Sequence, residues 1–84
     1  MSKPLVLIAD DDPLLRQILE HKLASNGYRV VAVEDGQAAL DAAAEKPSVI
    51  VLDAMMPVMD GFEALRRLKA DPDLKGITVV MLTV

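Results

Sequence analysis

Residues 5–23, with the sequence LVLIADDDPLLRQILEHKL, decide the fold of this chain. Leu5 to Ala9 form a short continuous apolar run, which is typical of a buried strand. Asp12 and Pro13 then indicate the start of a helix, because Asp is a good N-cap and Pro suits the first helical position. Four apolar residues follow at helical spacing, Leu15, Ile18, Leu19 and Leu23. The stretch therefore predicts a strand followed by an amphipathic helix.

The same unit recurs along the rest of the chain. The further predicted strands are Arg29–Val33, Val49–Leu52 and Ile77–Leu82. One further predicted helix begins at Asp35 and ends near Pro47. Another begins at Asp60-Gly61 and ends near Asp71-Pro72, and we expect its inner face to carry Phe62, Leu65 and Leu68. The order βαβαβαβ predicts one α/β domain over residues 1–84, built on a parallel sheet. The first and third strands are apolar throughout, so we expect helices on both faces of the sheet.

Composition restricts the function. A chain of 84 residues makes one small domain, and its nine basic residues are scattered against thirteen acidic ones, which argues against direct nucleic-acid binding. The chain has no cysteine, so it cannot form disulfides or thiolate metal sites. We see no signal peptide and no apolar stretch near the roughly 20 residues of a membrane span. The expectation is a cytoplasmic protein without a membrane partner.

Polar side chains stand where the predicted strands end. Asp10, Asp11 and Asp12 follow the first strand, Asp53 follows the third, and Thr83 follows the fourth. If the first and third strands are neighbours, Asp10, Asp11 and Asp53 converge at one edge of the sheet. Carboxylates so close repel one another, and a hard divalent cation such as Mg²⁺ would relieve that repulsion. A carboxylate beside a metal can also attack phosphorus and form an aspartyl phosphate.

Three segments together resemble a known family. Residues 7–12 (LIADDD), 51–61 (VLDAMMPVMDG) and 80–83 (VMLT) are similar in order and spacing to the receiver domain of response regulators, a CheY-like module of two-component signalling. The resemblance spans the whole chain, and its most specific part runs from Asp53 through Pro57 to Gly61. It implies a flavodoxin-like sheet of strand order 2-1-3-4, with the first helix on one face and the second and third on the other.

The resemblance also implies roles for individual residues. Asp53 would be the phosphoacceptor, and a histidine kinase or phosphotransfer protein would supply the phosphoryl group. The Mg²⁺ ligands would be Asp11 and Asp53 through their carboxylates, Asp10 through a metal-bound water, and Met55 through its backbone carbonyl. Thr83 would hydrogen-bond the phosphoryl group and report its presence. Such a module is not an enzyme beyond its own phosphorylation.

The family continues after the fourth strand with a helix, a strand and a helix. The fifth strand of the family carries a lysine that pairs with the phosphoryl group, so a chain ending at Val84 is expected to be a truncated receiver domain. One helix would then cover its face of the sheet alone, which leaves apolar groups of the first, third and fourth strands bare. The fourth strand would also be an apolar edge. We therefore expect a homodimer or higher oligomer.

Two other functions fit parts of the sequence. A non-signalling receiver fragment, natural or engineered, would self-associate but hold no stable phosphate. A phosphatase of the haloacid-dehalogenase type would use Asp10 as nucleophile and Asp12 as acid/base, and replacing Asp10 rather than Asp53 would abolish phosphate incorporation. That phosphatase family also needs a lysine and a further acidic motif at positions that this short chain does not provide. The phosphatase hypothesis also leaves residues 53–61 unexplained.

Overall fold

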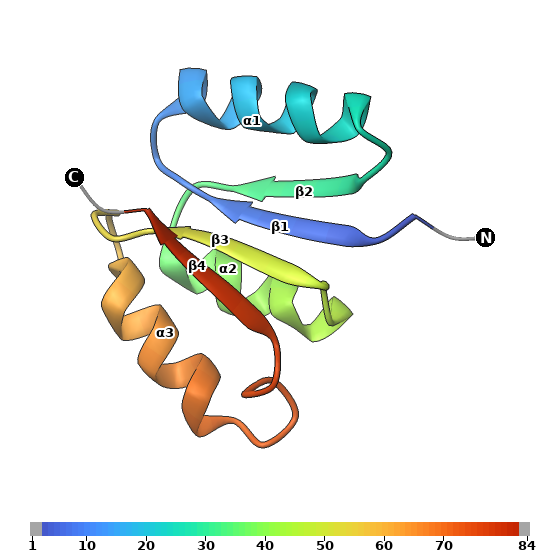
Figure 1. Cartoon of the computed structure of the whole chain (residues 1–84). Coiled ribbons are helices and arrows are strands. Elements are labelled where there is room, and N and C mark those ends of the chain that lie inside the picture. Colours follow the sequence, from blue (N-terminus) through green and yellow to red (C-terminus); the bar gives the residue numbers. More distant parts are fainter. Residues whose placement is uncertain (1–2, 83–84) are drawn as a thin grey trace.

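The computed structural model describes residues 3–82 and contains one four-stranded sheet with helices on both sides (Figure 1). The strands are β1 (Leu5–Ala9), β2 (Arg29–Val33), β3 (Val49–Asp53) and β4 (Thr78–Leu82). The helices are α1 (Pro13–Ser25), α2 (Gly36–Ala42), which continues into a 3₁₀ turn at Ala43–Glu45, and α3 (Gly61–Ala70). All four predicted strands and all three predicted helices are present in this order.

The sheet is parallel throughout, and its strands lie in the order β2-β1-β3-β4, as the sequence predicts. In register, Leu7 of β1 lies opposite Val31 of β2 and Ile50 of β3. Because parallel strands end at the same edge, the residues that follow β1, β3 and β4 lie together there. This flavodoxin-like α/β arrangement confirms the predicted fold class.

The two faces of the sheet are covered unequally. Helix α1 packs over β1 and β2 on one face, and α2 and α3 lie on the other, as Figure 1 shows. This division follows from right-handed crossovers between parallel strands. The core lies on the side of α2 and α3, and its buried residues are Leu7, Ala9, Ala39, Ala43, Ile50, Leu52, Ala64 and Leu68.

Burial along the strands confirms one prediction and corrects another. Every residue of β1 is buried, as its continuous apolar run predicts. In β3, Ile50 and Leu52 are buried but Val49 and Val51 are only half-buried, which agrees with the expectation that this strand is incompletely covered on one face. The expectation that apolar groups of the first strand are left bare is wrong, because α1 covers β1.

The faces of two helices also differ from the prediction. Phe62 is 58% exposed, so it does not lie on the inner face of α3, where the buried residues are Gly61, Ala64 and Leu68. The predicted apolar stripe of α1 does turn Leu19 and Leu23 partly inward, but no residue of this helix is buried. The physical reason is that α1 covers only half the width of the sheet, so its stripe has no neighbour on one side.

Candidate functional site

The acidic site begins at the end of β1, where Asp10 is 2% exposed. Its backbone N–H donates to the carbonyl of Val33 at 3.1 Å, which extends the pairing of β1 with β2 by one residue. Its Oδ1 accepts the N–H of Asp12 at 2.9 Å, and its carbonyl accepts Nη1 of Arg16 at 2.8 Å. Asp12 in turn caps α1 by accepting the N–H of Leu14 at 3.0 Å. These bonds fix the direction in which the chain leaves the sheet.

The second part of the site lies at the end of β3. Asp53 is the last residue of this strand and is half-buried. Its Oδ1 accepts the N–H of Met55 at 3.3 Å, so the loop after β3 helps to orient the carboxylate. The next residue, Ala54, donates its N–H to the carbonyl of Leu82 at 3.1 Å, which ties the loop to β4.

Neighbouring strands bring three carboxylates together. Asp10, Asp11 and Asp53 each offer an oxygen, and these oxygens lie within 4.8 Å of one another. Burial raises the pKa of the Asp10 carboxyl above 3.8, and the negative charges of Asp53 and Asp11 raise it further, although the hydrogen bond from Asp12 opposes them. This repulsion is the physical reason why the cluster favours a bound cation.

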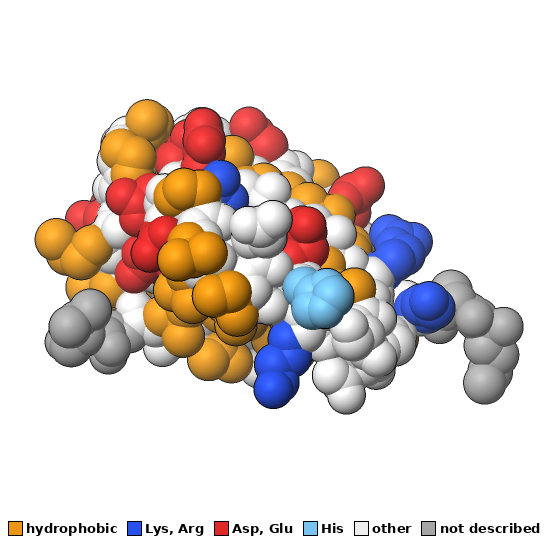
Figure 2. All heavy atoms as spheres, turned by 90° about the horizontal axis from the view of Figure 1, so that it is seen from above, with side chains coloured by type: hydrophobic (Ala, Val, Ile, Leu, Met, Phe, Trp, Pro, Cys, Tyr) orange, Lys and Arg blue, Asp and Glu red, His pale blue; other side chains and the backbone are white. Residues whose placement is uncertain are grey.

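The carboxylates lie in an open cleft of about 570 Å³. Its lining residues are Asp10, Asp11, Asp12, Leu15, Leu19, Asp53, Met55 and Leu82. One wall is therefore acidic and the other, from α1 and β4, is apolar. Figure 2 looks onto the α1 side of the molecule and shows acidic side chains next to a band of hydrophobic ones.

The loop between β3 and α3 begins directly after Asp53 and contributes Met55 to the lining of the cleft. Gly61 donates its N–H to the carbonyl of Ala54 at 3.0 Å, and a Cβ at Gly61 would lie 2.1 Å from the backbone oxygen of Asp53. Only glycine therefore fits where α3 begins beside the strand end. Asp60 caps this helix by accepting the N–H of Glu63 at 2.8 Å, as its position in the sequence predicts.

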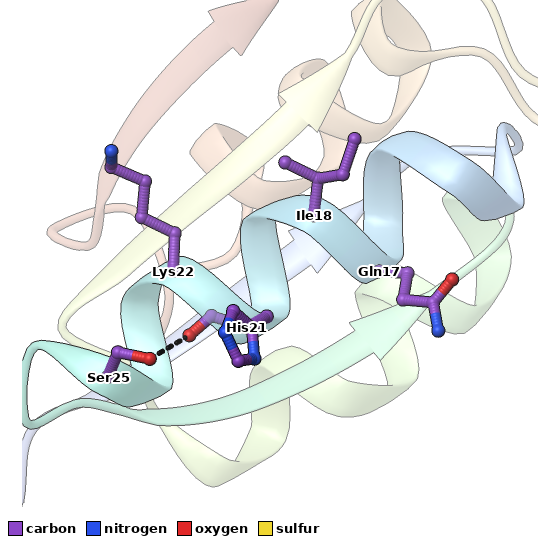
Figure 3. A pocket seen from close by; sticks show the side chains of 5 residues that line it. All are labelled: Gln17, Ile18, His21, Lys22 and Ser25. Carbon is purple, nitrogen blue, oxygen red and sulfur yellow. Dashed lines mark hydrogen bonds between the residues drawn. The ribbon is translucent and has the colours of Figure 1, made fainter.

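A second cavity, of about 510 Å³, lies beside α1 and away from the carboxylates (Figure 3). Its lining residues are Gln17, Ile18, His21, Lys22 and Ser25. The Ser25 hydroxyl donates to the backbone carbonyl of His21 at 2.8 Å, so it is engaged within the helix. His21 is exposed, and Lys22, the other titratable residue of the lining, points away from it in Figure 3. The side chains that line this cavity do not form a catalytic or metal-binding arrangement.

The structure brings together some of the predicted site residues. Asp10, Asp11 and Asp53 meet as expected, and Met55 follows Asp53 in the loop, with its side chain 73% exposed. Thr83 lies outside the described residues. Sequence reasoning missed Arg16 and the apolar wall from Leu82. A possible signal for Arg16 was its place one turn after the Asp12 cap, facing back toward the strand end.

In the part of the chain that the structure describes, no helix is long and apolar enough to cross a membrane.

Comparison with known proteins agrees with this geometry. The profile of the response regulator receiver domain matches residues 6–84. The response regulator MprA of Mycolicibacterium vanbaalenii is 40% identical over 79 residues, which are 93% of this chain and 33% of that protein. The response regulator PleD of Caulobacter vibrioides is 44% identical over 93% of this chain and 17% of its own length. The chain thus spans a third or less of these two relatives.

Solved structures give the same result. The N-terminal domain of a response regulator receiver protein from Methanoculleus marisnigri has 39% identity and a TM-score of 0.90, over 94% of this chain and 65% of that one. The receiver domain of a sensor histidine kinase from Pseudomonas aeruginosa, solved with a magnesium ion coordinated in its active site cleft, has 31% identity and a TM-score of 0.93. That match covers 98% of this chain and 68% of the other.

Proposed function

This chain belongs to the response regulator receiver domain family, and from that membership we propose that it is a phosphoacceptor module of a two-component system. In this proposal, Asp53 takes a phosphoryl group from a histidine kinase or a phosphotransfer protein. The observation that carries the proposal is the meeting of three carboxylates, from the ends of two neighbouring strands, within 4.8 Å in an open cleft. Transfer to Asp53 is the chain's own modification rather than turnover of a substrate.

The donor set fits Mg²⁺, because carboxylate and carbonyl oxygens are the ligands that this ion prefers. Asp11 and Asp53 would hold it through their carboxylates, Asp10 through a water molecule, and Met55 through its backbone carbonyl. Burial and the neighbouring negative charges, which raise the pKa of Asp10, support a cation at this place. When bound, Mg²⁺ supplies positive charge that neutralises the phosphoryl oxygens during transfer.

The chain's own residues orient the nucleophile. The N–H of Met55 engages Oδ1 of Asp53 at 3.3 Å, which leaves Oδ2 for the attack on phosphorus. An O–P bond forms at Asp53 while the P–N bond to the donor histidine breaks, and the imidazole nitrogen keeps the electron pair and takes up a proton. The apolar wall of the cleft, with Leu15 and Leu82, limits water around the reacting groups. The role of Thr83 and the cytoplasmic location remain predictions.

The decisive experiment is incubation of the chain with Mg²⁺ and a small acyl phosphate, followed by intact-mass measurement. We expect one phosphoryl group per chain, dependent on Mg²⁺ and absent in Asp53→Asn. Asp73→Asn is the matched control, because this exposed aspartate lies outside the cleft. Phosphate on the Asp53→Asn chain, or none on a folded wild-type chain, would contradict the proposal. Phosphate lost on replacing Asp10 but kept on replacing Asp53 would favour the phosphatase alternative.

A second candidate function, self-association without phosphotransfer, rests on β4. Within the described residues this strand is an edge of the sheet, and its sequence TVVML has no charge and no proline to discourage pairing. Val80 is 47% exposed, and Ile18 on α1 is 53% exposed. We propose that two copies pair antiparallel through β4. This pairing has two-fold symmetry, so it stops at two copies. It places the two acidic clefts on opposite edges of one continuous sheet.

Light scattering and sedimentation over a micromolar concentration series test this second candidate. We expect a dimer for the wild-type chain and a monomer for Val80→Lys, because a lysine on the edge would oppose pairing. Phe62→Lys is the control, since Phe62 is also exposed but lies on α3. A folded wild-type monomer at high micromolar concentration would rule the dimer out. A dimer that takes up no phosphate would replace the first candidate with the second.

A further inference from the structure

The loop between β3 and α3 is held by a glycine that lies far from it in sequence. Gly36, the first residue of α2, donates its N–H to the carbonyl of Met59 at 3.1 Å. A Cβ on Gly36 would lie 2.3 Å from that carbonyl oxygen and 3.0 Å from the carbonyl carbon and Cβ of Met59. Rotating a side chain cannot relieve these contacts, since the nearest atom belongs to the backbone. Any larger residue at position 36 would therefore have to displace the loop.

The turn that Gly36 contacts is strained. The N–H of Met59 donates to the carbonyl of Pro57 at 2.7 Å, two residues back, and Val58 between them has φ of +67°. A hydrogen bond of this span around a residue with positive φ is the less common, strained form of γ-turn. A β-branched residue keeps such a conformation only where surrounding contacts impose it. The bond from Gly36 is one of these contacts.

The strained turn is connected to the acidic site through a short backbone path. Where the loop leaves β3, the carbonyl of Ala54 accepts the N–H of Gly61, and the N–H of Met55 donates to Oδ1 of Asp53. At its far end, the Met59 side chain packs against the core and its carbonyl is held by Gly36. The loop is thus fixed at both ends, so a shift at Met59 displaces the segment that carries the Met55 carbonyl on one side and the start of α3 on the other.

We infer that Gly36 is a positioning residue of the acidic site, which sets the affinity for Mg²⁺ by holding the loop 54–60 in place. The inference rests on the proposed function, since it assigns the Met55 carbonyl and Asp53 to the metal. Gly36 touches neither the metal ligands nor a phosphoryl donor, and it acts only through Met59. Residues that orient metal ligands from outside the coordination sphere typically change metal affinity by about 10–100-fold when they are replaced.

The test is an Mg²⁺ titration of the 84-residue chain followed by amide NMR signals of the folded state. We expect Gly36→Ala to raise the Kd for Mg²⁺ by about 10–100-fold. Gly76→Ala is the matched control, because a Cβ at Gly76 meets no atom within 4 Å, and it should keep the wild-type Kd within about twofold. A purely structural role would lower the thermal midpoint of Gly36→Ala but leave the Kd of its folded molecules unchanged.

A measurement on the wild-type chain covers the case in which Gly36→Ala does not fold. If Gly36 holds the loop, Mg²⁺ should shift the Gly36 amide signal along with those of Asp53 and Met55, and leave that of Gly76 in place. A Gly36 signal that stays unmoved, or a folded Gly36→Ala chain with the wild-type Kd, overturns the inference alone. A wild-type chain that binds no Mg²⁺ overturns the proposed function and the inference with it.

Discussion

Asp10 is the one charged side chain that is buried among residues 3–82. Desolvation and the charges of Asp53 and Asp11 both disfavour its ionised form, which is why its pKa is raised. The single hydrogen bond from the Asp12 N–H offsets only part of this cost. A site that is useful for holding a cation is therefore unfavourable for folding when the cation is absent.

We predict that Asp10→Asn stabilises the metal-free chain at neutral pH by about 1–3 kcal/mol, the range of Coulomb repulsion at such distances between water and an effective dielectric constant of 20. Asparagine keeps the oxygen that accepts the Asp12 N–H. Urea unfolding with a chelator measures this gain. With Mg²⁺ added, the wild-type chain should gain more stability than the variant, because a ligand stabilises the state that binds it. A variant less stable than wild type under chelation would contradict this account.

Val58 gives a second prediction at the scale of single residues. It holds φ of +67° and is 84% exposed, so its backbone is strained while its side chain gains little from packing. The left-handed conformation costs roughly 1–2 kcal/mol, and the extra freedom of glycine in the unfolded chain offsets part of that. Val58→Gly should therefore raise the free energy of unfolding by up to about 1 kcal/mol. In urea unfolding, Val58→Ala should gain less because it keeps a Cβ, and equal gains would refute the strain argument.

At the scale of elements, α3 shows how local charges support a helix. Asp60 caps it, Glu63 lies in its first turn, and Arg67 and Lys69 lie in its last turn, which suits the helix dipole. Lys69 also reaches past the end of the helix and donates to the backbone carbonyls of Lys75 at 3.1 Å and of Ile77 at 3.3 Å. This contact secures the connection from α3 into β4.

Glu63 makes α3 sensitive to acid. Hydrogen bonds from Arg66 and then from Arg67 lower the pKa of Glu63 from 4.5 to about 2. Because this folded-state pKa lies below the unfolded value, the contribution to stability is present above pH 4.5 and is lost as the pH falls through about 2. We predict that the thermal midpoints of wild type and Glu63→Gln differ most above pH 4.5 and converge in that acidic range.

Two further tests bear on this helix. The difference between wild type and Glu63→Gln should be small, since the group is exposed, and it should shrink further in high salt. Glu45→Gln, on the 3₁₀ turn after α2, is the matched control for loss of a surface carboxylate. A gap between wild type and Glu63→Gln that widens on acidification would show that the two arginine bonds do not stabilise the fold.

At the scale of the whole molecule, stability is concentrated on one side of the sheet. The buried cluster lies between the sheet and the α2–α3 layer, whereas α1 contributes no buried residue. Leu68 of α3 is 1% exposed and Ile18 of α1 is 53% exposed, although both are large aliphatic side chains on helices. The α1 side is also the side of the open cleft, so the less well packed layer is the one next to the acidic site.

We predict that Leu68→Ala lowers the free energy of unfolding by about 2–5 kcal/mol, the usual cost of such a deletion in a core. Ile18→Ala should cost less than about 1 kcal/mol, since little of its surface leaves water on folding. Urea unfolding of both variants at a concentration where the chain is monomeric makes the comparison. Similar losses for the two variants would mean that the α1 side is as well packed as the α2–α3 side.

The sequence by itself determined the order of elements and which carboxylates meet at the acidic site. Continuous apolar runs, Asp caps and helical spacing are local signals, so β1, α1 and the cap at Asp60 could be predicted within one or two residues. The segment from Asp53 to Gly61 indicated the family, and the parallel order then predicted that Asp10, Asp11 and Asp53 meet. Such predictions succeed because strand ends converge in any parallel sheet.

Only the tertiary structure decided which apolar residues are buried and what holds the site. Phe62 and Leu68 both looked like core residues of α3, yet Phe62 is exposed, because burial depends on where the neighbouring elements lie and not on spacing alone. The contact of Gly36 with Met59 joins residues 23 positions apart, and no local pattern marks it. Long-range contacts of this kind arise only when the crossovers bring α2 beside the loop, which is why the sequence predicted the reactive groups but not their support.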